Sequence, residues 1–353
     1  MLAALEALVR AESPSEDIDA CRSVVILAAD IATRVLGTPA QIKEIEGRPV
    51  FWWGSETPRI VLLAHLDTVW PIGSFQPLWS VEGDVVRGPG TFDMKVGFVQ
   101  ALYALQGIDG DVALIATTDE EIGSHAAINL IKEVSSQATA VLVLEASLDG
   151  KLKTGRKGTA MYQIIVHGRS AHAGLEPEKG VNATVEIAHL ATQLSALENS
   201  AHGTTVVATT LSAGTTTNSV PDRAVLDIDA RSFSPEDLLR VDQALRSMKP
   251  RNPEARIEIT GGLHRPPMNP SSSEKLYKVA EKVAASLGMP AFGCANVGGA
   301  SDGNFAAATG VEVLDGLGAV GGGAHASHEW ASISAMEERS RFLHSFIKEL
   351  LNG

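Results

Sequence analysis

The sequence has 353 residues, a hydrophobic content of 44% and a formal net charge of -13 at pH 7. Because a chain of this length is long for a single hydrophobic core, two domains are expected. The negative charge repels phosphate backbones and no Lys/Arg-rich run offsets it, which argues against nucleic acid as a partner. No apolar run approaches the roughly 20 residues that a membrane-spanning helix requires, so no membrane partner is expected.

Two further features concern the cellular compartment. Cys21 and Cys294 lie far apart in the sequence and match no paired metal spacing, so neither a disulfide framework nor a thiolate metal site is expected. Residues 1–10 have a helical pattern and lack the basic start, apolar centre and cleavage site of a signal peptide. We therefore expect a cytoplasmic protein.

The first and last parts of the chain have the pattern of an α/β domain. Apolar runs predict buried strands, and apolar residues at helical spacing predict the helices around them. The expected strands are residues 50–53, 60–64, 140–144 and 311–314, together with the run that begins at Val112. The expected helices are residues 2–10, 17–36, 96–105, 129–134, 273–287 and 333–351.

The middle of the chain alternates apolar and polar residues instead. Strands are expected over residues 159–168, 204–211, 223–233 and 255–260, and helices over residues 181–197 and 234–248. The order strand, helix, strand, strand, helix, strand is that of a ferredoxin-like split unit with its own core. We therefore expect residues 158–263 to form an inserted α+β domain, with residues 1–157 and 264–353 forming one discontinuous α/β domain.

Acidic residues and one histidine follow three successive apolar strands. These strands end in His65, in Glu120-Glu121 and in Glu145, and Asp93 precedes a predicted helix between them. In open α/β sheets, ligands gather at the carboxyl ends of the strands. Taken singly, acids on a turn would be solvated, and Asp93 would serve as a helix N-cap. Their repetition at successive strand ends favours a cation site.

A second histidine completes the donor set. His325 follows a strand and a glycine-rich turn, and the five candidate ligands are His65, Asp93, Glu121, Glu145 and His325. This set of oxygen and nitrogen donors without sulfur suits zinc, with cobalt or manganese as alternatives. Five protein ligands overfill one tetrahedral zinc, whereas two ions bridged by Asp93 would each have three protein ligands and an open position.

Two acidic neighbours of the candidate ligands have other roles in this interpretation. Glu120 is left unassigned beside Glu121, so it can take a proton from the attacking water and return it to a leaving amine. Asp67 follows His65 at a spacing of two, and a ligating imidazole commonly donates its second N–H to a carboxylate.

The motifs that carry a family resemblance span nearly the whole chain. They are His65-Leu66-Asp67, residues 90–95 (GTFDMK), residues 118–123 (TDEEIG), Glu145, residues 170–174 (SAHAG) and residues 322–325 (GGAH). Together they resemble the co-catalytic zinc amidohydrolases, which include glutamate carboxypeptidase, acetylornithine deacetylase, succinyl-diaminopimelate desuccinylase and aminoacylase. The glutamate carboxypeptidase branch is the most similar.

This resemblance implies a zinc-exopeptidase-like catalytic domain with an inserted ferredoxin-like dimerisation (lid) domain. It implies two zinc ions that share Asp93, one with His65 and Glu145 and the other with Glu121 and His325. It also implies Glu120 as the catalytic base and Asp67 as the residue that orients His65.

The resemblance further implies a homodimer formed by the inserted domain, in which His172 reaches the partner's active site and steadies an oxyanion. Arg265 matches an arginine that binds the substrate carboxylate, and a guanidinium can grip a carboxylate through two parallel hydrogen bonds. Asn218 matches a residue that contacts substrate across the dimer, and Gly299 and Ser301 belong to a stretch that matches a pocket wall. One departure from the family is Val96, where a small residue is usual.

The expected function is metal-dependent hydrolysis of an amide bond next to a free carboxylate. The substrate would be a peptide that releases a C-terminal amino acid such as glutamate, or an N-acyl amino acid. Two alternatives remain. One is an aminopeptidase or dipeptidase that uses the same metal site and does not require a substrate carboxylate. The other is a non-catalytic binding protein with the same fold.

A serine hydrolase is the alternative chemistry. Residues 299–303 (GASDG) fit the Gly-x-Ser-x-Gly elbow around Ser301, and Asp315 and His325 follow in the order of that class. Against it, no clear strand precedes Ser301, little chain separates Asp315 from His325, and the acids at the strand ends would be unexplained.

Overall fold

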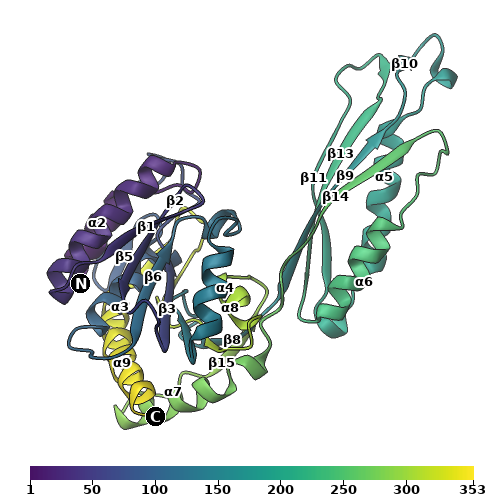
Figure 1. The fold of residues 1–353 in the computed structure, drawn as a ribbon. Helices are drawn as coiled ribbons and strands as arrows, with labels where there is room; N and C mark the ends of the chain where they lie inside the picture. The colour runs from purple at the N-terminus through teal and green to yellow at the C-terminus, as the bar shows by residue number, and fades with distance from the viewer. The chain divides into compact units, whose positions relative to one another are not determined.

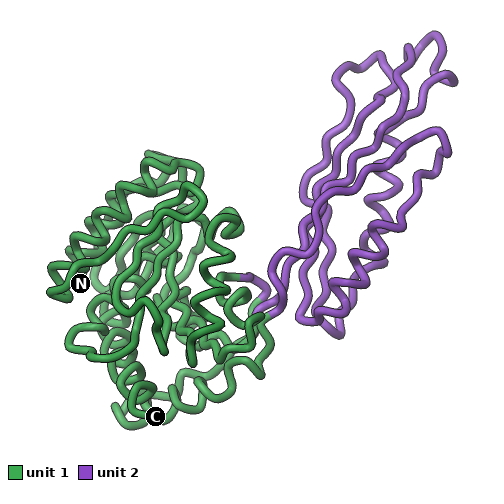
Figure 2. The backbone as a smooth tube through the Cα atoms, in the orientation of Figure 1, with its two compact units in different colours: residues 1–155, 268–297, 301–353 green, residues 156–267, 298–300 purple.

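The computed structural model describes residues 1–353, which fold into two compact units (Figure 2). Unit 1 comprises residues 1–155, 268–297 and 301–353, and unit 2 comprises residues 156–267 and 298–300. Each unit has its own hydrophobic core.

A six-stranded sheet forms the centre of unit 1. Its strands, in spatial order, are β1 (Gln41–Ile45), β2 (Arg48–Gly54), β6 (Val112–Thr117), β3 (Ile60–His65), β7 (Ala140–Val143) and β16 (Glu312–Leu314). The four strands from β6 to β16 run parallel to one another, whereas β2 pairs antiparallel with both of its neighbours, β1 and β6. Every residue of β3 and β6 is buried, because helices cover both faces of a sheet of this kind.

Helices pack on the two faces of this sheet (Figure 1). One face packs against α1 (Leu2–Arg10), α2 (Ile18–Leu36), α3 (Val96–Ala104), α7 (Glu274–Ser286) and α9 (Ile333–Asn352). The other face packs against α4 (Ile128–Gln137) and α8 (Asp302–Ala307). On the first face the rings of Phe51 and Phe98 meet edge to face with centroids 5.0 Å apart. None of the helices combines the length and apolarity needed to span a membrane.

Two smaller sheets complete unit 1. One contains β17 (Gly321–Gly322), β18 (Trp330–Ser332), β5 (Val85–Arg87) and β4 (Ser80–Glu82), and the other pairs β15 (Cys294–Val297) with β8 (Leu152–Arg156). Strand β15 corrects the expectation that no strand precedes Ser301. It escaped the sequence analysis because it has four residues, none of which is fully buried.

Unit 2 is a four-stranded antiparallel sheet with helices on one face. The strand order is β11 (Thr205–Ala213), β13 (Arg223–Ser232), β9 (Gly158–His167) and β14 (Arg256–Arg265). Residues of β13 alternate between buried and less buried, as expected for a sheet with one covered face. The covering helices are α5 (Ala183–Gln193) and α6 (Pro235–Arg246), and the helix predicted over residues 181–197 ends as a 3-10 turn, Leu194–Leu197.

Candidate metal centre

The parallel strands of unit 1 bring three donor groups to one edge of the sheet. His65 is the last residue of β3, and the 3-10 turn Glu120–Ile122 follows the end of β6. Glu145 lies two residues beyond the end of β7. Because β3 pairs with both β6 and β7 in parallel, the carboxyl ends of all three strands meet.

Asp93 comes from an irregular turn before α3. This turn, Thr91–Lys95, has π-helical hydrogen bonding, and Asp93 itself has an extended backbone with φ of -120° and ψ of 89°. Helix α3 begins after Lys95 and has no side-chain cap, so the alternative of Asp93 as its N-cap is wrong. The extended backbone leaves the Asp93 carboxylate available to the strand ends.

Each of the two oxygens of Asp93 faces a different histidine. Oδ1 lies 3.3 Å from Nε2 of His65, and Oδ2 lies 3.4 Å from Nε2 of His325. His65 Nε2 is also 3.7 Å from Glu145 Oε1, and His325 Nε2 is 3.0 Å from Glu121 Oε2. Two three-residue groups therefore share Asp93, and the donor atoms within each group lie within 4.8 Å of one another.

The electrostatics of the five residues reflect this crowding. Burial opposes charge on His65, but hydrogen bonds with Asp67 and Asp93 outweigh it and hold the pKa of His65 well above its usual value. Hydrogen bonds with Asp93 and Glu121 raise the pKa of His325 to about 10. Burial raises the pKa of Glu121 to about 8. The negative charge of the crowded carboxylates Asp93 and Glu121 is charge that a divalent cation can neutralise.

The donor set fits a pair of divalent ions. Each group offers one imidazole nitrogen and two carboxylates, a set that suits zinc and other first-row metals, and neither group contains sulfur. A carboxylate whose two oxygens point in different directions is suited to bridge two ions. The exposed fraction of the side chains ranges from 1% for His65 to 53% for His325, so the site is reached from the His325 side.

Asp67 is bonded to four neighbours. Its backbone carbonyl lies 3.1 Å from Nδ1 of His65, and its carboxylate Oδ1 lies 3.4 Å from the same nitrogen. The carboxylate also accepts hydrogen bonds from the backbone N–H groups of Glu120 and Glu121 and from the hydroxyl of Ser15. The fully buried Asp67 thus ties His65 to the turn that carries both glutamates.

Glu120 lies beside the donor groups. Its side chain lines the same small cavity as His65 and Glu145, whereas Glu121 is turned toward His325. The preceding acid, Asp119, accepts hydrogen bonds from the backbone N–H groups of Ala126 and Ala127 and so holds the entry to α4. The three consecutive acids therefore point to three different surroundings.

Glu329 is a residue of this site that the sequence analysis missed. It is 1% exposed, and its carboxylate accepts hydrogen bonds from the backbone N–H groups of Gly90 (3.1 Å), Phe92 (2.8 Å) and Asp93 (3.1 Å). The indole N–H of Trp70 donates to it as well, at 3.1 Å. Glu329 therefore positions the turn that carries Asp93. Its signal in the sequence is only its place four residues after His325.

Several residues of the predicted site lie in unit 2. His172 is exposed in the short strand β10 (Ala171–His172), which pairs with β12 (Ser219–Val220), and the N–H of Ala173 donates to the carbonyl of Asn218. His172 and Asn218 are therefore neighbours.

Arg265 is at the end of β14, paired in register with Thr159, and is 7% exposed. The Gly299 carbonyl accepts a hydrogen bond from Arg156 at 3.1 Å.

Ser301 is buried and serves as the N-cap of α8. Its hydroxyl oxygen accepts from the N–H of Gly303 and its proton goes to Asp315 Oδ2 at 2.9 Å, while Asn304 completes a capping box. His325 faces Asp93 and Glu121 instead of this serine. The geometry therefore gives no Ser-His pair of the kind that a serine hydrolase needs.

Comparison with known proteins agrees with this geometry. Residues 61–349 match the model of peptidase family M20/M25/M40. Carboxypeptidase G2 of Pseudomonas sp. (strain RS-16) is 32% identical over 317 residues, which cover 83% of this chain and 74% of that protein. Succinyl-diaminopimelate desuccinylase of Sulfurovum sp. (strain NBC37-1) is 25% identical over 324 residues, which cover 85% of this chain and 86% of that protein.

A solved structure confirms the fold. The M20 family metallo-carboxypeptidase of Sulfolobus solfataricus superposes with a TM-score of 0.77 at 18% identity, over 98% of each chain. The predicted α/β catalytic domain with an inserted α+β domain is thereby confirmed. The chain belongs to peptidase family M20/M25/M40 and is an enzyme of the metallopeptidase and amidohydrolase type.

Proposed function

We propose that the protein hydrolyses an amide bond next to a free carboxylate, releasing a C-terminal amino acid such as glutamate or deacylating an N-acyl amino acid. The observation that carries this proposal is the pair of donor groups that share the two oxygens of Asp93, with Glu120 beside them. One group would be His65, Asp93 and Glu145, and the other Asp93, Glu121 and His325. Two divalent ions, zinc first, would polarise the scissile carbonyl and lower the pKa of the attacking water.

Glu120 would move the proton in this reaction. Its carboxylate takes a proton from the attacking water and delivers it to the nitrogen of the leaving amine, so that the C–N bond breaks without releasing an amide anion. Asp67 supports this step indirectly, because it holds the backbone of Glu120 and the ring of His65 in place.

The residues of unit 2 would recognise the substrate. Arg265 would bind the free carboxylate through parallel hydrogen bonds, the geometry in which a guanidinium is most selective. Asn218 and Gly299 would contact the remainder of the leaving amino acid. Ser301 lies in unit 1 and would contribute only by holding the backbone at the start of α8 in place.

We also propose a homodimer that forms through unit 2. Strand β11 is an edge strand and carries the exposed apolar residues Val207 and Leu211, which are 49% and 50% exposed. An edge of this kind is a ready template for pairing with a second chain. In the dimer, the exposed His172 of one copy would donate a hydrogen bond to the developing oxyanion at the other copy's centre. The cytoplasmic location stays a prediction.

Replacing Glu120 by Gln tests the mechanism. The change keeps the shape of the side chain and removes the proton acceptor, so kcat should fall at least about 100-fold with metal content unchanged. The matched variant Glu121→Gln should instead lose bound metal, measured by elemental analysis after dialysis. A Glu120→Gln enzyme that loses its metal but keeps its activity would contradict the assignment.

A substrate panel tests the requirement for a carboxylate. The zinc-loaded protein would be given N-acyl amino acids and dipeptides, each beside its C-terminal amide. Cleavage of the acids alone, with Arg265→Lys raising KM, would support the carboxylate contact. Equal cleavage of the amides would direct the search to aminopeptidase or dipeptidase chemistry on the same site.

A further inference from the structure

Three side chains of unit 2 form a row across its four-stranded sheet. They are Arg231 of β13, Thr159 of β9 and Arg265 of β14, and these strands are neighbours in the sheet (Figure 1). Thr159 is directly opposite Arg231 on one side and directly opposite Arg265 on the other. Because directly opposite residues of antiparallel strands project from the same face, Thr159 lies between two arginine side chains. The next residue, Ala160, belongs to the core under α5 and α6, so the row is on the other face of the sheet.

The hydroxyl of Thr159 is buried and has no hydrogen-bond partner in the protein. The residue is 3% exposed, and a buried hydroxyl without a partner is costly and uncommon in folded proteins. Thr204, which is also in unit 2 and 3% exposed, shows the usual arrangement. Its hydroxyl bonds with Ser232 at 2.8 Å and with Asp237 at 2.6 Å. Thr159 therefore retains a hydrogen-bonding capacity that the fold does not use and that a ligand can satisfy.

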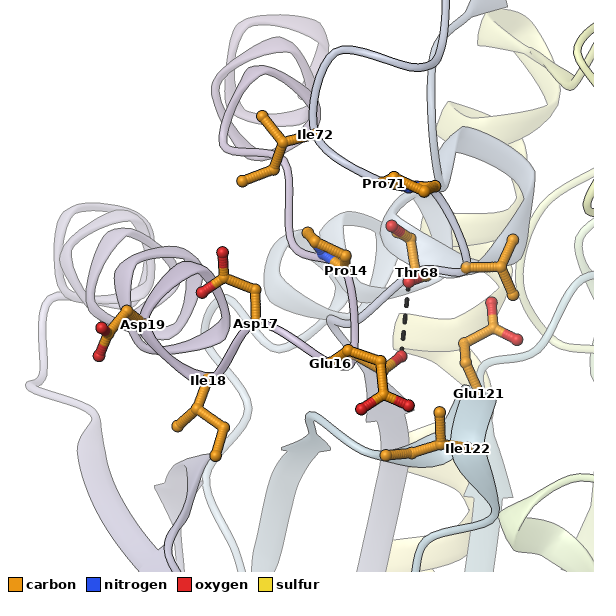
Figure 3. A pocket seen from close by; sticks show the side chains of 12 residues that line it. Pro14, Glu16, Asp17, Ile18, Asp19, Thr68, Pro71, Ile72, Glu121 and Ile122 are labelled. Carbon is orange, nitrogen blue, oxygen red and sulfur yellow. Dashed lines mark hydrogen bonds between the residues drawn. The ribbon is translucent and has the colours of Figure 1, made fainter.

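The pocket at the start of α2 in unit 1 lacks this feature. It has a volume of about 770 Å³, and Figure 3 shows Asp17, Asp19 and Glu121 among the side chains that line it. None of its lining residues has a buried polar side-chain atom without a hydrogen-bond partner. The hydroxyl of Ser15, for example, donates to Asp67 at 2.7 Å. The hydroxyl of Thr159 is therefore the stronger indication of a ligand contact.

The two arginines of the row have different surroundings. Arg231 donates to both carboxylate oxygens of Asp229, at 2.8 Å and 2.9 Å, and to the carbonyl of Gly298 at 3.2 Å. These bonds fix its guanidinium group, because the donors of this group form a rigid planar fork. Arg231 is thus engaged with the protein itself, and Arg265 is the arginine of the row that the proposed function assigns to the substrate.

The charges beside the hydroxyl determine which kind of ligand group it can meet. A position between two guanidinium groups attracts an anion and repels a cation. A hydroxyl can donate to an oxygen of an anion, and such a bond is stronger than one between neutral groups. A carboxylate has two oxygens and about four acceptor positions, so it can accept from a guanidinium group and from a hydroxyl at the same time.

We propose that Thr159 is a further substrate-binding residue, whose hydroxyl donates a hydrogen bond to the free carboxylate that Arg265 binds. This inference rests on the proposed function, in which that carboxylate belongs to the leaving amino acid. It gives the carboxylate a second, uncharged donor, and it accounts for a hydroxyl at a buried position where the fold provides no partner. Thr159 then contributes to the selection of a free acid over the corresponding amide.

Thr159→Val tests the proposal, because valine keeps the branched shape of the side chain and removes the hydroxyl. With the acid that the substrate panel shows to be cleaved best, KM should rise at least about 10-fold and kcat should change less than about twofold, because the lost bond is to a charged group. Binding of the same acid to zinc-loaded Glu120→Gln protein, measured by calorimetry, should weaken by a similar factor. The C-terminal amide of this acid, measured as a competitive inhibitor, should weaken by a smaller factor because it is uncharged. Thr159→Ser keeps the hydroxyl and should restore most of the affinity.

Urea unfolding separates a ligand contact from support of the fold. Thr159→Val should unfold at the same or a higher urea concentration than wild type, because it removes a buried hydroxyl that has no partner. The matched control Thr204→Val should unfold at a lower urea concentration with KM unchanged, because its hydroxyl is bonded.

Three results would overturn the inference and leave the proposed function standing. They are an unchanged affinity of Thr159→Val for the acid, equal losses of affinity for the acid and its amide, and a lowered urea midpoint for Thr159→Val. If no compound of the panel is cleaved in a Glu120-dependent way, the proposed function itself fails.

Discussion

Replacing Glu329 by Gln should weaken metal binding, although Glu329 is not itself a candidate metal ligand. The Glu329 carboxylate accepts four hydrogen bonds, two at each oxygen. In the amide, one of these oxygens becomes an NH₂ group that cannot accept. Either the N–H groups of Phe92 and Asp93 or those of Gly90 and Trp70 then face a donor, and the residue is 1% exposed, so water cannot replace the lost acceptor.

The magnitude follows from the number of donors left without an acceptor. Each buried polar group without a partner costs roughly 1–3 kcal/mol, so two of them cost about 2–6 kcal/mol if the turn does not move. A shift of the turn costs less free energy than two buried donors without an acceptor, and this shift displaces Asp93 from both donor groups. Loss of such a supporting partner typically lowers metal affinity about 10-fold to 100-fold.

The assay is competition for zinc with a chelator of known affinity, together with the visible spectrum of the cobalt-loaded protein. Glu329→Gln should release metal at a lower chelator concentration and change the cobalt spectrum, because the ligand geometry changes. Glu82→Gln, an exposed acid on β4, is the matched control and should behave as wild type. A Glu329→Gln protein with wild-type metal affinity and an unchanged cobalt spectrum would refute the role of Glu329 as a positioning residue.

Three further predictions concern metal removal, thiol reactivity and acid stability. Saturating metal at about 1,000 times its dissociation constant should raise the free energy of unfolding by about 4 kcal/mol, which chelation followed by urea titration would reveal as a lowered midpoint. A thiol reagent should label the exposed Cys294 in the native protein and Cys21 only after denaturation, because burial raises the pKa of the Cys21 thiol to about 12; two native labels would contradict this. Hydrogen bonds from Thr204 and Arg240 lower the pKa of Asp237 to about 2. Since the stability from a lowered pKa is present above the unfolded value and lost as pH falls toward the folded value, Asp237→Asn should cost about 2 kcal/mol at pH 7 and progressively less between pH 4 and pH 2, measured by urea unfolding.

Sequence patterns predicted the elements whose signal is local. The apolar runs of β3 and β6 are buried strands, and the amphipathic periods of α2 and α9 are helices with nearly the expected bounds. The expectation that His65, Glu121 and Glu145 meet followed from a general property of parallel sheets, whose strand ends meet at one edge. The assignment of Asp93 to one group with His65 and Glu145 was implied by the family resemblance. The strands that escaped prediction are two to five residues long, and some of them form because a distant strand supplies the hydrogen bonds, as Leu152–Arg156 does for Cys294–Val297.

The site residues that sequence reasoning missed or misjudged depend on distant partners. Glu329 bonds with backbone groups more than 230 positions earlier in the chain, a relation that has no local pattern. Ser301 had a local signal that was overlooked, because Ser301 and Asn304 have the spacing of a capping box. The glycines around Ser301 instead suggested a nucleophile elbow.

The pairing of β9 with β14 has a consequence for the order in which the protein folds during synthesis. The chain enters unit 2 along β9 and leaves along β14, and the two strands are neighbours in register, with Thr159 opposite Arg265. All strands and helices of unit 2 are therefore complete before β16 and α9 of unit 1 emerge from the ribosome. Once unit 2 has folded, its first and last strands are held side by side. The inserted segment then no longer acts as a long flexible loop, and bringing together the parts of unit 1 before and after it costs less loop-closure entropy.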